Sequence, residues 1–224
     1  MNALQKELRL DRQPRHIECF DNSNLQGAHP VASCVVFRDG KPARKDYRHF
    51  NIKTVEGPDD YASMREVVFR RYSRLQEEGA ELPDLIIADG GKGQMGIIHE
   101  VLEYLGLDIP VAGLAKNDRH RTSELLCGYP PVLVGIRPTS PLFHFLAHIQ
   151  EEVHRFAVSF HRQKRSKAFI HSELEQIEGI GDKTIRTLLQ HFRSVAKVKA
   201  APAEELSALV GPAKAKKIRA FFEK

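Results

Sequence analysis

The sequence predicts a mixed α/β domain followed by a small all-helical domain, and three features of the chain lead to this prediction. Strand-like segments joined by tight turns come first, helical and strand-like segments then alternate, and a helical motif is repeated near the C-terminus. The 224 residues are enough for one full domain and a small second one. We expect domains of residues 1–165 and 166–224.

The first three strands are expected to form an antiparallel meander. Residues 16–21, 31–37 and 47–52 are rich in β-branched, aromatic and other apolar side chains. Turn signals separate them, namely residues 23–27 and the Asp39-Gly40 pair. Because strands joined by tight turns run antiparallel, these segments predict one side of a sheet.

Helices and strands alternate in the next part of the chain. Apolar residues recur at helical spacing from residue 61 to residue 75, and residues 85–88 form an unbroken apolar run that ends at Asp89. Such a run is typical of a parallel strand that is covered on both faces. A helix over residues 95–105 and a strand over residues 111–115 follow. Right-handed crossovers would place the fourth strand beside the first, so that Asp21 and Asp89 emerge at one edge of the sheet.

A hairpin and a long helix complete the first domain. Residues 124–127 and 132–134 predict a small β-hairpin, and a helix is expected from Ser140 to Phe160. The basic run over residues 161–167 is interpreted as the end of this helix and the start of an exposed linker.

The C-terminal part contains an internal repeat of two helical hairpins. The segment Ser172-Glu173-Leu174-Glu175 has the pattern of a capping box and predicts a helix start. The turn Gly179-Ile180-Gly181 and the turn over residues 210–213 lie about 32 residues apart, counting Gly179 to Gly211. Each copy is too small to bury a core by itself, so the two are expected to pack together.

Two carboxylates at neighbouring strand ends indicate a site for Mg²⁺ or Mn²⁺. Hard cations take oxygen ligands and keep several waters for a substrate phosphate, as Asp21 and Asp89 would allow. Such a cation polarises a phosphoryl oxygen and generates the attacking hydroxide. On the residues alone, capping of the following helix explains Asp89 about equally well, and Asp60 is equally well explained by its place in a first helical turn.

The histidines and the glycine-rich loop indicate a functional site less clearly than the two carboxylates do. His144 and His148 lie one turn apart, as in a transition-metal pair, although packing in an apolar-rich helix explains them better. His154 belongs to a titratable cluster over residues 151–155 that either lines a site or forms a solvated face. The segment Gly91-Lys92-Gly93 lacks the spacing of a phosphate loop, which argues against nucleotide binding.

The hairpin turns are candidate DNA contacts. Small residues between two helices let backbone N–H groups converge on a phosphate, and such contacts bind without sequence preference. A plain αα-hairpin is the alternative, and it is stronger for the second copy because Ala213 replaces the second glycine. The residues expected to contact DNA are Lys92, Gly179, Gly181, Lys183, Thr184, Gly211, Lys214, Lys216 and Lys217.

Composition excludes several classes of protein. The net charge of +5 modestly favours polyanions as partners. Three cysteines without metal-ligand spacing argue against a disulfide framework and a zinc module, and they fit a reducing cytoplasm. The chain has no apolar run of about 18 residues and no signal-type N-terminus, so secretion and membrane insertion are not expected.

Four sequence blocks resemble the signature blocks of the C-terminal half of UvrC, the nuclease subunit of bacterial nucleotide excision repair. They are Ile17-Glu18-Cys19-Phe20-Asp21-Asn22-Ser23-Asn24, Gly57-Pro58-Asp59-Asp60-Tyr61, Asp89-Gly90-Gly91-Lys92-Gly93-Gln94 and His154-Arg155-Phe156-Ala157. The resemblance covers nearly the whole chain in the right order. It implies a ribonuclease-H-like endonuclease domain and a tandem helix-hairpin-helix domain.

The resemblance also implies a role in the DNA-damage response. It implies incision on the 5′ side of a lesion, with Asp21, Asp89 and His154 as the catalytic and metal-binding set and Asp60 as a further acidic residue. The implied cofactor is Mg²⁺ or Mn²⁺, and the implied partners are damaged double-stranded DNA and UvrB in a UvrB–DNA pre-incision complex. The family's usual UvrB-binding segment is not visible, and we expect a monomer.

The sequence departs from the family pattern at three positions and leaves a second function open. Asn22, Gln150 and Glu151 stand where the family usually has Ile, Arg and Asp. These departures bear on the contacts around the site more than on its chemistry. The alternative function is a catalytically inert ribonuclease-H-like scaffold that carries a structure-specific DNA-binding module.

Overall fold

The computed structural model describes residues 1–23, 31–55, 57, 59–116 and 122–223, without the side chains of Ser23, Lys116, Thr122, Ser123 and residues 161–172. Of the turn expected over residues 23–27, residues 24–27 lie outside the described residues, and Ser23 belongs to the first strand. Internal contacts divide the chain into two units, Met1–His161 and Arg162–Lys224. Each unit is described by itself.

The first unit is built on a mixed sheet, as the sequence predicted. Its order is β3-β2-β1-β5-β6-β7-β8, with β4 also paired to β2. β1 pairs antiparallel with β2 and parallel with β5, and β5 pairs parallel with β6. The strands are β1 (His16–Ser23), β2 (Val31–Arg38), β3 (Lys41–Pro42), β4 (Arg48–Asn51), β5 (Leu85–Ala88), β6 (Val111–Lys116), β7 (Thr122–Cys127) and β8 (Val132–Val134).

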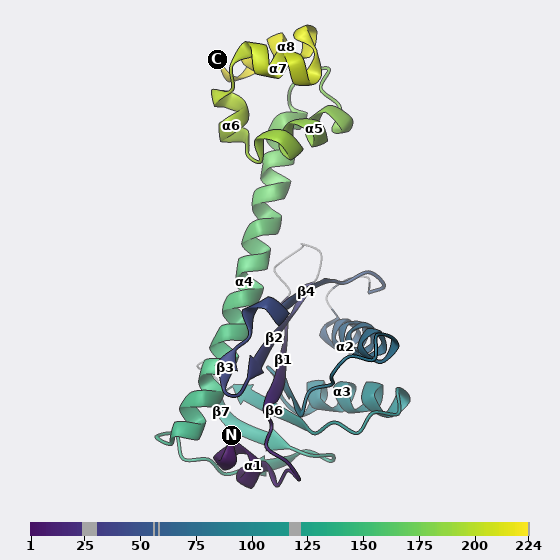
Figure 1. Cartoon of the computed structure of the whole chain (residues 1–224), viewed down its shortest axis with the longest axis vertical. Helices are drawn as coiled ribbons and strands as arrows, with labels where there is room; N and C mark the ends of the chain where they lie inside the picture. The colour runs from purple at the N-terminus through teal and green to yellow at the C-terminus, as the bar shows by residue number, and fades with distance from the viewer. Residues whose placement is uncertain (24–30, 56, 58, 117–121, 224) are drawn as a thin grey trace. The chain divides into compact units, whose positions relative to one another are not determined.

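Helices cover both faces of this sheet. Figure 1 shows α2 (Asp60–Glu77) and α3 (Lys92–Tyr104) on one face and α4 (Pro141–Glu175) on the other, and α1 (Asn2–Leu8) lies near the N-terminus. All four residues of β5 are fully buried, which explains their unbroken apolar run. The short β3 and the 3₁₀ helix η1 (Arg44–Asp46) were not predicted, because two or three residues are too few to show a period.

The prediction of a helix start at Ser172 is wrong. α4 continues through the basic run and through residues 172–175 before it ends at Glu175, so the basic run is helical and is not the end of this helix. The capping-box pattern is a local signal, and residues 142–178 contain no glycine or proline that would stop the helix. The first hairpin therefore begins with the C-terminal end of α4.

The second unit is a tandem of helical hairpins, as the repeat predicted. Its helices after α4 are α5 (Asp182–Phe192), α6 (Val195–Ala200), α7 (Ala203–Val210) and α8 (Pro212–Phe222). They share a separate core that contains Leu174, Ile185, Leu188, Leu206 and Ile218. α6, which joins the two hairpins, was not predicted. Within the described residues, no helix is long and apolar enough to cross a membrane.

A buried ionic cluster joins β1 to α2. The Glu18 carboxylate, fully buried, accepts hydrogen bonds from Arg71 (2.6 and 3.2 Å) and from the Tyr72 hydroxyl (3.0 Å), and His16 Nε2 lies 3.4 Å away. Burial alone would raise the pKa of Glu18, but the hydrogen bonds and charges of His16 and Arg71 outweigh it and lower the pKa to about 2. Glu18 is therefore ionised across the neutral range.

This cluster predicts a pH-dependent effect of Glu18→Gln. The variant should lose about 3–5 kcal/mol of unfolding free energy at pH 7, because it leaves Arg71 buried without its counter-charge. A carboxylate with a lowered folded pKa stabilises above its unfolded pKa of about 4.3, and this stabilisation is lost as the pH falls toward about 2. Urea unfolding from pH 7 to pH 3 should therefore show the difference narrowing below about pH 4.

Glu78→Gln is the matched control, since Glu78 is an exposed partner of Arg74 on the same helix. It should change stability by less than about 1 kcal/mol. A Glu18→Gln deficit that stayed constant down to pH 3 would contradict the assigned ionisation.

Candidate functional site

The two aspartates predicted at one sheet edge do lie beside each other. β1 and β5 pair in parallel up to Phe20 and Ala88, and the Asp89 backbone N–H donates to the Phe20 carbonyl oxygen (2.8 Å). The pairing therefore continues to Asp21, which lies within β1, and to Asp89, which directly follows β5. Parallel neighbours are about 4.8 Å apart, so the two carboxylates share one edge.

Asp89 is not the N-cap residue of the helix that follows it. The N-cap of α3 is Gly91, and no side chain makes the cap hydrogen bond. Asp89 lies before that cap, held by its backbone bond to β1. The role of Asp89 as a cation ligand stays a prediction.

Asp60 is placed near the same edge by Asn22. The Asn22 side-chain amide donates to the Asp60 carbonyl oxygen (2.7 Å), which ties the end of β1 to the start of α2. The N-cap of α2 is Asp59, whose carboxylate accepts from the Ala62 N–H (2.9 Å). Asp59 is therefore the N-cap residue, and Asp60 lies in the first turn of α2, so both explanations of Asp60 stay open.

His154 approaches Asp21 from α4. Its Nδ1 lies 3.6 Å from Asp21 Oδ2, and the histidine side chain is 62% exposed while the Asp21 side chain is 8% exposed. Asp21 Oδ2 is itself buried and has no hydrogen-bond partner among the described residues. A buried carboxylate oxygen without a donor, beside an accessible imidazole, is suited to a cation or a proton.

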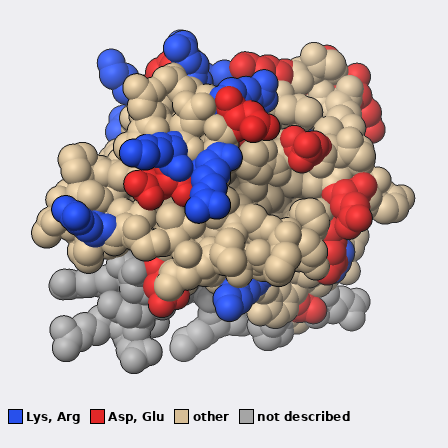
Figure 2. Space-filling view, turned by 90° about the horizontal axis from the view of Figure 1, so that it is seen from below, with Lys and Arg blue, Asp and Glu red and all other residues tan. Residues whose placement is uncertain are grey.

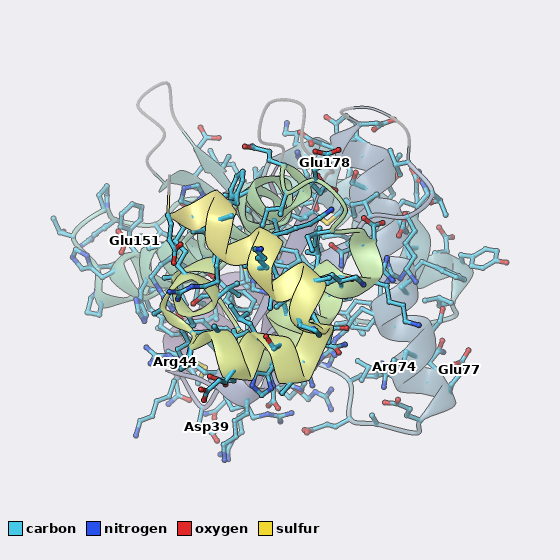
Figure 3. The ribbon with its side chains drawn as sticks, turned by 90° about the horizontal axis from the view of Figure 1, so that it is seen from above. Asp39, Arg44, Arg74, Glu77, Glu151 and Glu178 are labelled. Atoms are coloured by element: carbon cyan, nitrogen blue, oxygen red, sulfur yellow. The ribbon has the colours of Figure 1, made fainter. Side chains whose placement is uncertain are left out.

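The titratable cluster over residues 151–155 separates into two parts. Glu152 is 6% exposed and accepts from the Tyr47 hydroxyl (3.0 Å) and from Arg155 (2.7 and 2.9 Å). These hydrogen bonds, that of Arg155 foremost, lower the pKa of Glu152. Glu151, labelled in Figure 3, is exposed. The cluster thus contains a structural carboxylate, a solvated one and the site histidine.

His144 and His148 of α4 do not join this site. His148 packs edge-on against Phe37, with ring centroids 5.7 Å apart, and His144 is exposed with its ring 6.3 Å from that of Phe143. The packing explanation of this pair is therefore the one that the structure supports.

The donor set fits a hard cation held partly by water. The described part of the chain contains no group of three or more His, Cys, Asp or Glu side chains arranged to hold a metal ion. Mg²⁺ is usually bound through only one or two carboxylates together with waters and substrate phosphates. Asp21, with its unsatisfied Oδ2, and Asp89 supply such a pair.

The candidate DNA contacts of the second unit gather at the first hairpin. Lys214 Nζ donates to the Thr184 hydroxyl (2.9 Å), and the Lys217 amine lies beside Gly179. Gly179 has φ +81°, whereas Gly181 has φ −89° and open space where a Cβ would lie. A side chain is therefore disfavoured at Gly179 by the backbone itself, whereas at Gly181 it would affect only what approaches the turn from outside.

Two features of the first unit were not predicted, although Gln150 had been noted as a departure from the family pattern. Gln150 on α4 donates a hydrogen bond to Asp89 Oδ1 (2.5 Å). A groove of about 890 Å³ lies between α2 and α3, where Phe69 and Tyr104 are 41% and 80% exposed.

On the face of this unit seen in Figure 2, acidic and basic side chains are intermixed, so this face does not carry charges of one sign only.

The fold and site define a class, and comparisons with known proteins agree with it. Residues 5–158 match the family described as the UvrC RNAse H endonuclease domain, and residues 172–224 match the family described as a SAM-like Helix-hairpin-helix tandem. The first unit is thus a ribonuclease-H-like endonuclease domain, and the second is a helix-hairpin-helix tandem. The chain belongs to the UvrC family.

Curated relatives match nearly the whole chain. The UvrABC system protein C of Bacteroides fragilis is 59% identical over 219 residues, which are 98% of this chain and 36% of the relative. That of Flavobacterium johnsoniae is 52% identical over 225 residues, 100% of this chain and 37% of the relative. The chain therefore spans little more than a third of the length of these relatives.

Proposed function

We propose that this chain is a divalent-metal-dependent endonuclease that cuts DNA on the 5′ side of a lesion in nucleotide excision repair. The observation that supports it best is the Asp89 N–H bond to Phe20, which brings Asp21 and Asp89 side by side, with His154 Nδ1 3.6 Å from Asp21 Oδ2. Family membership supports the reaction class. The activity is a proposal because the chain spans 36% of the Bacteroides fragilis relative.

The residues divide the chemistry among them. A bound Mg²⁺ or Mn²⁺ would polarise the scissile phosphate and supply the attacking hydroxide. Asp21 and Asp89 would hold the cation through carboxylate oxygens, and Asp60 would add negative charge from the start of α2. His154, whose exposed side chain lies beside Asp21, would either bind the cation or transfer a proton at its imidazole nitrogen.

The two units are proposed to divide cleavage and binding, with the domains at residues 1–165 and 166–224. The carboxylate edge repels phosphate until a cation is bound, whereas the hairpins offer backbone amides and lysines. We propose that the hairpin residues and Lys92 contact damaged duplex DNA. The proposed setting is a UvrB–DNA pre-incision complex in the cytoplasm, which the chain joins as a monomer.

A nicked duplex that carries a lesion tests the activity. The whole chain should cut the strand on the 5′ side of the lesion in Mg²⁺ or Mn²⁺ and should leave it intact in EDTA. UvrB is included in a parallel reaction, because the partner is part of the proposal. Tight DNA binding without cleavage in either reaction would support the inert scaffold instead.

Removal of the second unit should weaken DNA binding without unfolding the first. A chain that ends at Lys167 keeps the complete core of the first unit. Its melting temperature should therefore stay close to that at which the first unit unfolds in the parent. For every phosphate that the shortened chain no longer binds, the dependence of log affinity on log salt should flatten by about 0.9. Equal affinities and slopes would show that the hairpins do not bind DNA.

Gly181→Ala should weaken DNA binding while leaving the fold intact. The added methyl group meets no atom and no backbone strain, so only a phosphate that approaches Gly181 would be blocked. Gly96→Ala on α3, also in open space, is the control and should bind as the parent does. Fluorescence anisotropy across a salt series measures both, and a parent-like Gly181→Ala would remove this turn from the interface.

A further inference from the structure

Gln150 is buried between α4 and the catalytic edge, where it uses both of its donors. It is 5% exposed, and its Nε2 donates to Asp89 Oδ1 (2.5 Å) and to the Leu114 carbonyl oxygen (3.1 Å) on β6. A primary amide nitrogen carries two N–H groups. Both donors are therefore engaged by fixed acceptors.

The two acceptors settle which end of the amide faces Asp89. A backbone carbonyl and an ionised carboxylate only accept hydrogen bonds, so the flipped amide would face them with its own oxygen. The Leu114 carbonyl belongs to the sheet and cannot rotate away. Gln150 is thus held by β6 while it holds Asp89, which follows β5.

The same helix serves both carboxylates. Gln150 and His154 are four residues apart, so they lie on one face of α4. Gln150 contacts Asp89, and His154 lies 3.6 Å from Asp21. The packing of α4 on the sheet, with Ile149 and Val153 fully buried, therefore sets the position of both contacts.

We propose that Gln150 is a positioning residue that fixes the Asp89 carboxylate for a divalent cation, an inference that rests on the proposed function. The hydrogen bond sets the rotation of the carboxylate and hence the direction of both oxygens. Because the amide is neutral, it orients Asp89 without cancelling the charge that attracts the cation. Partners of metal ligands commonly act in this way, and their loss costs about 10–100-fold in metal affinity or activity.

Titration with Mn²⁺, followed by the electron paramagnetic resonance of the free ion, tests this role in the whole chain. Gln150→Met keeps the length of the side chain but removes both donors. Gln150→Asn keeps the amide but is one methylene too short to reach Asp89 from α4. Both should bind Mn²⁺ about 10–100-fold more weakly than the parent.

The matched control is Gln76→Met. Gln76 also donates to a backbone carbonyl, that of Leu105 (3.1 Å), but lies at the far end of α2. It should bind Mn²⁺ as the parent does. In the cleavage assay, Gln150→Met should lower kcat by a similar factor and leave the DNA dissociation constant unchanged, a split that a general loss of structure would not give.

The outcomes separate this inference from the proposed function. A folded Gln150→Met with parent-like Mn²⁺ affinity would overturn the positioning role. If Gln150→Met does not fold, the Mn²⁺ affinity of Gln150→Asn is the deciding measurement, and a parent-like value would overturn the role. If Asp89→Asn loses Mn²⁺ while the Gln150 variants keep it, only the positioning role fails. If the parent binds no Mn²⁺, the proposal of a metal site is wrong, and the positioning role of Gln150 is wrong as well.

Discussion

Asp89→Asn should abolish DNA incision while the fold is retained. The substitution removes the negative charge of one proposed cation ligand but changes the side-chain volume little. The backbone N–H bond to Phe20 does not depend on the side chain, so the end of β5 should keep its place. Incision rates and melting temperatures of parent and variant, measured together, check this expectation. Asp21→Asn should behave in the same way.

Asp59→Asn is the matched control for the aspartate variants. Asp59 caps α2 near the same edge, and asparagine is an equally good N-cap. This variant should therefore incise at the parent rate. If Asp89→Asn nicks DNA as fast as the parent, in an assay shown to detect the parent, the assignment of the site is wrong.

His154→Ala should lower the rate of incision by about 10²–10⁴-fold, the range typical of general acid–base groups. Its side chain is 62% exposed, so its removal should cost little stability. Single-turnover cleavage with the parent and the variant measures the loss. Added imidazole should restore part of the rate if the residue transfers a proton, but not if it holds the cation.

His144→Ala provides the comparison on the same helix. His144 is exposed and lies away from Asp21 in the structure, so the variant should remain fully active. An inactive His144→Ala beside an active His154→Ala would mean that the wrong face of α4 has been assigned.

Periodicity and chain topology were sufficient to predict the carboxylate edge. An apolar run that ends in Asp89, together with the right-handed crossover rule, predicts that this residue lies beside Asp21. Both signals are properties of a strand and its connections. The register of β1 and β5 confirms the arrangement.

Contacts between distant residues were not predictable in the same way. Gln150 reaches Asp89 across 61 positions of sequence, and Asn22 reaches Asp60 across 38, in each case through a single polar side chain with no periodic pattern.

The prediction of where α4 ends was wrong for another reason. The capping-box residues from Ser172 are also tolerated inside a helix, and the absence of a helix breaker decided the outcome.

Anomalous diffraction from Mn²⁺-soaked crystals of the whole chain would show whether Asp21 and Asp89 bind a cation, because it locates the ion without requiring DNA or partner proteins. We expect a peak within bonding distance of one carboxylate oxygen of Asp21 and one of Asp89, beside His154, and loss of that peak in Asp89→Asn. A fully loaded crystal with its Mn²⁺ elsewhere, and with no peak between these two aspartates, would contradict a metal-dependent nuclease centre at this edge.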